Sequence, residues 1–339
     1  MEQHPTERTP LVSVIMIFLN GEKYIAEAIE SVLAQTLTDW ELVLVDDGTT
    51  DGATAVARDF ASRHADRISV IEHPGHANLG MSASRNAGLH AARGRHVAFL
   101  DADDVWLPER LAVQAEVIEA HPEVSIVIEP MLYWTSWANA THRAARRDTS
   151  GQLTGELGLP VGEVLEPPTV AIGYLENGGG TVPGICSVLA RREDVLAVGG
   201  FEPRFRTLYE DQVFFFRMAL RYRTIALDSV NSLYRQHDAS ACHHEGMAQG
   251  HMKARPAFLE WLQDHLIDEG IKDRRIWRAF RAEMLPFDRP DLLGVRVRRL
   301  VDRVGMASRD TVIRVVGPSR YNALRRRYKL KRIEPLPPH

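Results

Sequence analysis

The stretch FLDADDVW, residues Phe99–Trp106, is the part of the chain from which the rest can be interpreted. An apolar run over residues 96–100 predicts a buried strand, which ends in three carboxylates, Asp101, Asp103 and Asp104. Carboxylates this close repel one another and are costly to desolvate unless a cation lies among them. A hard divalent ion such as Mg2+ takes one or two carboxylates together with phosphate oxygens. The stretch therefore indicates either a metal-diphosphate site or a loop that caps the following helix.

Apolar runs alternate with helical patterns on the N-terminal side of this stretch. Strands are predicted over residues 11–18, 40–45 and 68–72. Helices are expected between them, over residues 22–35, 52–64 and 81–92. This alternation indicates right-handed crossovers and an open α/β sheet. Ligands bind such sheets at the carboxyl ends of the strands, where the acidic pair Asp46-Asp47 and the triplet both fall.

The C-terminal side of the stretch is less regular. A helix near 108–120 and strands near 124–128, 185–190 and 225–227 are expected, with a helix over 212–221. Residues 138–184 are rich in loop formers, and Tyr133, Trp134 and Trp137 precede them as either sugar-stacking platforms or core aromatics. Glu210 and Asp211 open the helix expected over 212–221, where the helix dipole favours acids, so either this dipole interaction or a general base explains them.

Composition excludes several classes of protein. The chain has 339 residues, of which 45% are hydrophobic and 25% charged, as in an ordinary soluble globular protein. Two cysteines far apart predict neither a disulfide framework nor a zinc cluster, which favours a cytoplasmic location. No leader peptide or membrane-spanning run is recognisable. No GxGxxG follows the first strand, so a dinucleotide-binding fold is disfavoured. No P-loop sequence is present either.

Several separated motifs occur together in one order. They are Ser13–Asn20 (SVIMIFLN), Val45–Gly52 (VDDGTTDG), Arg85–Gly88 (RNAG), Phe99–Asp104 (FLDADD), Gly199–Phe201 (GGF), Glu210-Asp211 and Tyr234–His237 (YRQH). In this combination the chain resembles the family 2 glycosyltransferases over residues 11–240. The resemblance implies a GT-A fold, a Rossmann-like open mixed sheet flanked by helices, and an inverting transfer from a nucleotide-sugar, most often a UDP-sugar.

The resemblance implies roles for residues at the donor site. Asp47 would accept a hydrogen bond from the nucleobase, and Arg85 would contact the nucleotide or its diphosphate. Asp101 would orient the donor sugar or ribose, with Glu210 also among the donor-binding residues. The family usually has Pro, Thr and Tyr where this chain has Ile17, Phe18 and Leu19. The base-stacking aromatic is therefore absent from its place, and Phe18 is the nearest substitute, although strand alternation points it to the other face.

The resemblance also implies a metal and a base. Asp103 would be the direct ligand of Mg2+ or Mn2+, and His237 would complete the metal shell or touch the diphosphate. Asp211 would be the general base that takes the proton of the acceptor hydroxyl. The partners expected are a nucleotide-sugar donor and a glycan or other hydroxyl acceptor.

The C-terminal part of the chain is strongly basic. Residues 272–332 carry 19 Lys or Arg against 6 Asp or Glu, a balance of +13, which leaves -17 for the rest of a chain with net charge -4. Residues 292–304 have an apolar stripe flanked by arginines, and a polybasic cluster follows at 325–332. Such a helix suits an anionic membrane surface, which would place the enzyme peripherally near a lipid-linked acceptor; packing on the body is the alternative. Nucleic-acid binding is not favoured, because no recognition motif accompanies the charge.

The sequence leads to one domain division and three functional hypotheses. Residues 1–240 would form the GT-A domain, with 11–129 as the nucleotide-sugar half and 130–240 as the acceptor half, and 241–339 a basic, mostly helical extension. The first hypothesis is a metal-dependent glycosyltransferase. The others are a catalytically silent nucleotide-sugar binding protein and a sugar-phosphate nucleotidyltransferase. A nucleotidyltransferase would need a glycine-rich phosphate loop after the first strand, and residues 18–22 do not provide one.

Overall fold

The computed structural model describes residues 9–134, 157–176, 182–237 and 247–288, and for residues 247–253 it describes the backbone only. Trp137 and the basic segments 292–304 and 325–332 therefore lie outside the described residues. Among the described helices, none is long and apolar enough to cross a membrane.

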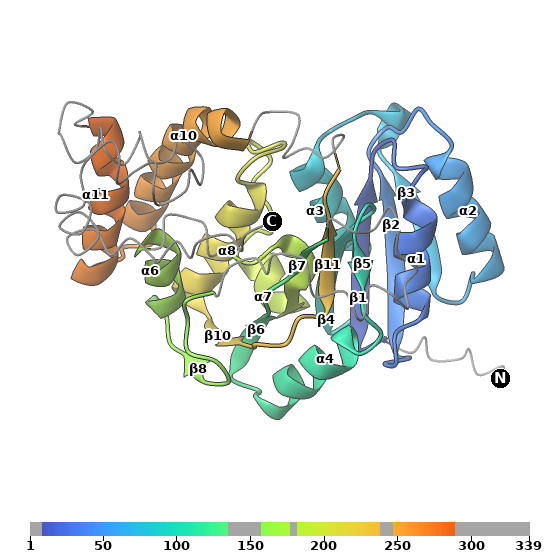
Figure 1. Ribbon diagram of the computed structural model, residues 1–339, viewed down its shortest axis with the longest axis horizontal. Coiled ribbons are helices and arrows are strands. Elements are labelled where there is room, and N and C mark those ends of the chain that lie inside the picture. The colour runs from blue at the N-terminus through green and yellow to red at the C-terminus, as the bar shows by residue number, and fades with distance from the viewer. Residues whose placement is uncertain (1–8, 135–156, 177–181, 238–246, 289–339) are drawn as a thin grey trace, which may run out of the picture.

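A central eight-stranded sheet organises the molecule, in the order β3-β2-β1-β4-β9-β6-β10-β8 (Figure 1). Its strands are β1 (Val12–Phe18), β2 (Trp40–Asp46), β3 (Ile68–Glu72), β4 (His96–Asp101), β6 (Val124–Ile128), β8 (Val164–Leu165), β9 (Val188–Arg191) and β10 (Arg223–Ala226). Strands β1 to β4 are parallel, whereas β9 runs antiparallel to both of its neighbours, β4 and β6. The α/β class and the order of the N-terminal elements agree with the sequence prediction. The strand expected at 185–190 instead begins with a single helical turn, Ile185–Ser187.

Strand β1 explains why the opening apolar run is uninterrupted. Val12, Val14 and Met16 belong to one hydrophobic cluster, whereas Ile15 and Ile17 belong to another on the opposite face. Side chains alternate across a strand, so a strand covered on both faces needs apolar residues at every position. The result is a three-layer arrangement of helix, sheet and helix.

Helices cover the two faces of the sheet in sets. The first set contributes to the cluster that contains Val12 and consists of α1 (Ile25–Leu33), α2 (Ala53–Arg63) and α4 (Arg110–Ala120). The second set contributes to the other cluster and includes α3 (Met81–Ala91), α6 (Thr169–Glu176), α7 (Arg192–Ala197) and α8 (Glu210–Arg221). Helix α3 lies so close to the sheet that a Cβ atom on Gly88 would be 2.4 Å from Ile15 Cγ2. A single helical turn, Pro74–His76, connects β3 to α3.

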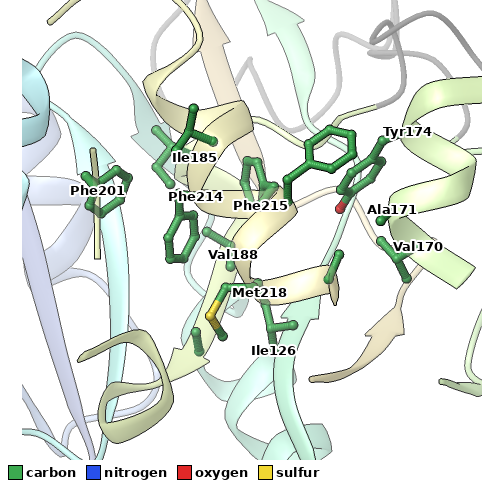
Figure 2. Packing of buried hydrophobic residues seen from close by; sticks show 14 of the residues in the cluster. Ile126, Val170, Ala171, Tyr174, Ile185, Val188, Phe201, Phe214, Phe215 and Met218 are labelled. Carbon is green, nitrogen blue, oxygen red and sulfur yellow. The ribbon is translucent and has the colours of Figure 1, made fainter. Parts of the chain in front are cut away.

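An aromatic core joins α8 to its neighbours. Figure 2 shows Phe214 and Phe215 of α8 between Phe201 on one side and Tyr174 of α6 on the other. Phe201 and Phe214 are stacked, with ring centroids 4.7 Å apart. Helices α10 (Met247–Asp268) and α11 (Arg274–Asp288) contribute to the same cluster and lie at the end of the molecule opposite α2 (Figure 1).

A second, three-stranded sheet was not predicted. Its order is β5-β11-β7, with β5 (Val105–Trp106), β11 (Ser232–Arg235) and β7 (Leu132–Trp134). Strand β11 is antiparallel to β5 and parallel to β7. Because β5 directly follows the acidic triplet, this pairing brings the Tyr234–His237 motif, more than a hundred residues away in sequence, next to that triplet.

Candidate functional site

The acidic triplet forms the turn between β4 and β5. The amide of Asp104 donates to the carbonyl of Asp101 (3.0 Å), which closes the turn. Asp101 and Asp103 are partly exposed, whereas Asp104 is buried. Burial, and then the charges of Asp103 and Asp101, raise the pKa of Asp104 well above its usual value. The turn thus presents two carboxylates outward and keeps the third inside.

The structure brings the two predicted metal ligands together. His237 Nε2 lies 3.0 Å from Asp103 Oδ2, and the imidazole ring packs against Tyr24, with ring centroids 4.7 Å apart. The other ring nitrogen, Nδ1, is buried and has no hydrogen-bond partner among the described residues. A carboxylate oxygen beside an imidazole nitrogen is a donor set that a divalent ion accepts. The residues present therefore fit the metal that the sequence implied.

Sequence reasoning missed the part played by Arg235. Its backbone amide donates to Asp104 Oδ1 (2.9 Å), and its Nε donates to the carbonyl of Asp103 (2.6 Å). Its Nη2 reaches Glu27 Oε2 on α1 (2.5 Å), and the guanidinium lies over the rings of Tyr24 and Trp134. Arg235 therefore fixes the acidic turn to α1 and to the small sheet. Its place in the YRQH motif was the only signal in the sequence.

Arg85 lies between two of the other predicted residues. Its Nη2 donates to Asp101 Oδ1 (2.8 Å) and its Nη1 donates to Glu210 Oε1 (2.7 Å). Burial opposes the charged form, but these two carboxylates raise the pKa of Arg85 above its usual value. The side chain is only 2% exposed. The guanidinium of Arg85 is therefore already buried and paired, so this arrangement does not support the expected direct contact with a diphosphate.

Glu210 and Asp211 begin α8, as the sequence indicated. Burial and the adjacent charge of Asp211 raise the pKa of Glu210 to about 8, against the opposing effect of Arg85. Glu210 is buried against that arginine, so it supports the site from behind and is not presented to a ligand. Asp211 is half-buried, and its Oδ1 accepts a hydrogen bond from the amide of Gln212 (2.7 Å). Since Arg85 joins Glu210 to Asp101, Asp211 lies in the neighbourhood of the acidic turn.

Asp47 ties the end of β2 to the loop before α3. Its carboxylate accepts hydrogen bonds from the amides of Leu79 (2.8 Å) and Gly80 (3.1 Å), and His73 Nε2 lies 3.6 Å from Oδ1. The carboxylate is buried. Asp47 thus shapes the loop at the carboxyl end of β2, and its role toward a nucleobase stays a prediction.

Phe18 is not presented as a stacking surface. It is 3% exposed and belongs to the cluster that contains Met16 and α1, as strand alternation required. Leu19, the next residue, is 47% exposed at the carboxyl end of β1. The substitute role considered for Phe18 is therefore not supported by its placement.

A second group of potential ligands lies at the carboxyl ends of β2 and β3. Among the described residues, Asp46, Glu72 and His76 offer ligand atoms within 4.8 Å of one another. These atoms already have partners: Asp46 accepts from the Thr54 hydroxyl (2.5 Å), Glu72 pairs with Arg58, and His76 Nε2 contacts the carbonyl of Thr49 (2.7 Å). Although burial opposes it, hydrogen bonds from Thr54 and Thr49 lower the pKa of Asp46. The three side chains are therefore already paired with protein groups, and they stabilise the loop after β2.

Comparison with known proteins finds similarity in the N-terminal part of the chain. Residues 13–161 match the family model described as glycosyl transferase family 2. This part of the chain, the family 2 segment, is thus similar to glycosyltransferases. EpsE of Bacillus subtilis, described as a putative glycosyltransferase, is 41% identical over 123 residues, which is 36% of this chain and 44% of EpsE. WfgD of Escherichia coli, named as a UDP-Glc:alpha-D-GlcNAc-diphosphoundecaprenol beta-1,3-glucosyltransferase, is 37% identical over 108 residues, 32% of this chain and 41% of WfgD. The chain thus spans less than half the length of these relatives.

A likeness to a solved structure extends further along the chain. Staphylococcus aureus TarS 1-349, crystallised with UDP-GlcNAc, superposes with a TM-score of 0.52 over 92% of this chain and 83% of that one, at 19% identity. At this identity the likeness shows the fold, and it confirms the predicted GT-A architecture. Asp47, Arg85, Asp101 and Asp103 lie within the family 2 segment, whereas residues 210, 211 and 237 lie beyond it.

Proposed function

We propose that this chain is an inverting, metal-dependent glycosyltransferase that moves a sugar from a UDP-sugar to a hydroxyl acceptor. The observation that carries the proposal is the bridge Asp101–Arg85–Glu210, with contacts of 2.8 and 2.7 Å. It links the acidic turn after β4 to the beginning of α8. A donor bound at the turn would therefore have a carboxylate, Asp211, close to its sugar. The match of residues 13–161 to the family 2 model supports the same reaction class.

The chemistry assigns a role to each of three carboxylates, Asp211, Asp101 and Asp47. Asp211 accepts the proton of the acceptor hydroxyl as its oxygen attacks the anomeric carbon. The bond from that carbon to the diphosphate oxygen breaks, and its electron pair leaves with UDP. Attack opposite to the leaving group inverts the anomeric configuration. Asp101, held by Arg85, orients the donor, and Asp47 accepts a hydrogen bond from the uracil N-H.

Asp103 and His237 are the residues that would hold Mg2+ or Mn2+. Two protein ligands leave room for diphosphate oxygens, which is how such ions are commonly shared between a carboxylate site and a nucleotide. A bound ion would neutralise charge on the departing diphosphate. Arg235 keeps this pair in place from its contacts to Asp103 and Asp104.

The acceptor we propose is a glycan on a lipid carrier, in bacterial surface polysaccharide assembly. The relative WfgD is named for a diphosphoundecaprenol-linked acceptor. The basic balance of residues 272–332 would attract an anionic membrane surface, placing a cytoplasmic enzyme beside such an acceptor.

Calorimetric titration with UDP, GDP and TDP, each with and without Mn2+, tests the donor site. We expect UDP to bind with metal, and the Asp103→Ala variant to weaken that binding by at least about tenfold. Asp66→Ala is the matched control, because Asp66 is an exposed carboxylate whose ion-pair partner among the described residues is its neighbour Arg67. Equal UDP affinity of the Asp103→Ala and Asp66→Ala variants would refute the metal assignment.

Asp211→Asn separates an enzyme from a silent binding protein. The substitution keeps the shape of the side chain but removes its basicity. We expect UDP binding to stay within about twofold of wild type, while turnover of the UDP-sugar falls by about a hundredfold or more, the typical contribution of a general base. Full turnover in this variant would exclude Asp211 as the base, and no turnover by the wild type with any donor would favour the binding-protein hypothesis.

A further inference from the structure

The turn that precedes Asp211 has an unfavourable backbone conformation. Tyr209, two residues earlier, has φ of 67° and ψ of 4°, in the left-handed region. A non-glycine residue in this region is strained and keeps the conformation only where its surroundings enforce it. The contacts around Tyr209 therefore determine how α8 begins and where Asp211 lies.

Those contacts come from α10, which lies beyond the family 2 segment. The Tyr209 ring is stacked on Phe258 with centroids 5.1 Å apart and an interplanar angle of 20°. The guanidinium of Arg255 lies 5.8 Å from the Tyr209 centroid and 5.3 Å from that of Phe258. Its Nη1 donates to Gln212 Oε1 (3.3 Å). Arg255 therefore contacts the residues on both sides of the Glu210-Asp211 pair.

Helix α11 fixes Arg255 in turn. Arg255 Nη2 donates to Glu283 Oε2 (2.8 Å), and both side chains are buried. A buried charge-assisted hydrogen bond of this kind orients a guanidinium more rigidly than an exposed one. From the other direction, Glu210 is held by Arg85. The beginning of α8 is thus held between the acidic turn and the C-terminal helices.

We propose that Arg255 is a positioning residue for the transfer reaction, acting through Tyr209 and Gln212 to hold the carboxylate of Asp211. The proposal rests on the proposed function for the part that concerns catalysis. Because Arg255 contacts the base-bearing turn and not the ends of β1, β2 or β4, its loss should reduce kcat and leave donor binding unchanged. The C-terminal helices then belong to the catalytic machinery, although they lie outside the segment that defines the family.

The chain provides a matched control at the C-terminal end of α8. Arg221, the last residue of α8, pairs with Glu269, the residue that follows α10, through contacts of 2.6 and 2.8 Å. Arg221→Met removes the arginine-glutamate link between the end of α8 and the residue that follows α10, without touching residues 209–212. Arg255→Met and Arg221→Met therefore differ in which end of α8 they release.

Two measurements on the full-length variants test the proposal. The first is steady-state UDP release from UDP-glucose and from UDP-GlcNAc in Mn2+, with water as the acceptor, together with the calorimetric Kd for UDP. For Arg255→Met we expect kcat to fall by about tenfold to a hundredfold, the effect of a misplaced reacting group, with KM and Kd unchanged. Arg221→Met should keep kcat within about twofold, and Arg255→Lys, which retains one hydrogen bond to Glu283, should be intermediate.

The second measurement does not depend on activity. Hydrogen exchange at the start of α8, where the amide of Val213 donates to the carbonyl of Tyr209 (3.0 Å), should be at least about tenfold faster in Arg255→Met and unchanged in Arg221→Met. Unchanged exchange, or a kcat of Arg255→Met equal to that of Arg221→Met, would overturn the proposal. If Arg255→Met does not fold, Glu283→Gln, which loosens the same guanidinium, replaces it under the same criteria. Inactivity of the wild type would refute the proposed function, and exchange would still decide the positioning of the turn.

Discussion

Replacing Arg85 with methionine removes the guanidinium that joins Asp101 to Glu210 while keeping most of the side-chain volume. The arginine is buried, and Glu210 is buried beside it, so their ion pair is shielded from solvent. Removing one partner of a buried pair typically costs about 3–5 kcal/mol, because the other charge is left uncompensated.

Two features of the site reduce that cost. Asp101 is 28% exposed at its side chain, so water can solvate it once the arginine is lost. Burial and the charge of Asp211 raise the pKa of Glu210 to about 8 against the opposing effect of Arg85, so without the arginine Glu210 is held as the neutral acid and not as a bare charge. We therefore expect the lower end of the range, a loss of about 3 kcal/mol in the free energy of unfolding. Glu210→Gln, which leaves the Arg85–Asp101 pair intact, should cost about 1 kcal/mol.

Urea unfolding followed by circular dichroism measures these differences, provided that the variants share one denaturant slope. The double variant Arg85→Met/Glu210→Gln should lose about 1–2 kcal/mol less than the sum of the single losses, because the two residues share one interaction. Arg58→Met is the matched control: its arginine is 62% exposed and pairs with Glu72, so a change of at most about 0.5 kcal/mol is expected. If Arg85→Met were no more destabilising than Arg58→Met, the bridge would not hold the two halves of the site together.

Two further predictions concern the scaffold. Gly88→Ala should destabilise the fold by about 1–3 kcal/mol in the same urea assay, because its Cβ would lie 2.4 Å from Ile15 Cγ2. Alanine favours helices, so a gain in stability would contradict the packing of α3 against the sheet. Burial lowers the pKa of His96 despite its hydrogen bond to Glu119. Below about pH 6.5 the unfolded chain therefore binds a proton that the folded chain does not, and the free energy of unfolding of the wild type falls. His96→Gln lacks this loss, so its deficit relative to wild type should narrow between about pH 8 and pH 5.5; a constant deficit would show that His96 is not buried in its neutral form.

The N-terminal half of the fold follows from local patterns because its strands are buried on both faces. The apolar run of β1 and the helical spacing of α1 are signals contained within single elements. Strands β5 and β7 have two and three residues, too short for any periodicity, so the second sheet could not be predicted. Its existence depends on pairing between segments separated by about a hundred residues.

The site divides in the same way. Motif resemblance placed Asp103 beside His237 and put Glu210 at the beginning of α8. It did not predict that Arg85 would be buried between Asp101 and Glu210, because that arrangement depends on a contact across 125 positions of sequence. It also overlooked Arg235, whose partners lie on α1 and on the acidic turn. For Phe18 the alternation of the strand already pointed to the opposite face, and the structure agrees with that argument.

The position of β9 has a consequence for exchanging parts between relatives. The segment with recognisable family similarity ends at residue 161, yet β9, at 188–191, separates β4 from β6 and hydrogen-bonds to both. Strands from inside and outside this segment therefore alternate within one sheet, and no boundary between two separate units lies at residue 161. A chimaera joined at residue 161 would have to recreate two strand interfaces at once. Specificity in this protein is thus better altered by substitutions on the existing framework than by transplanting its second half.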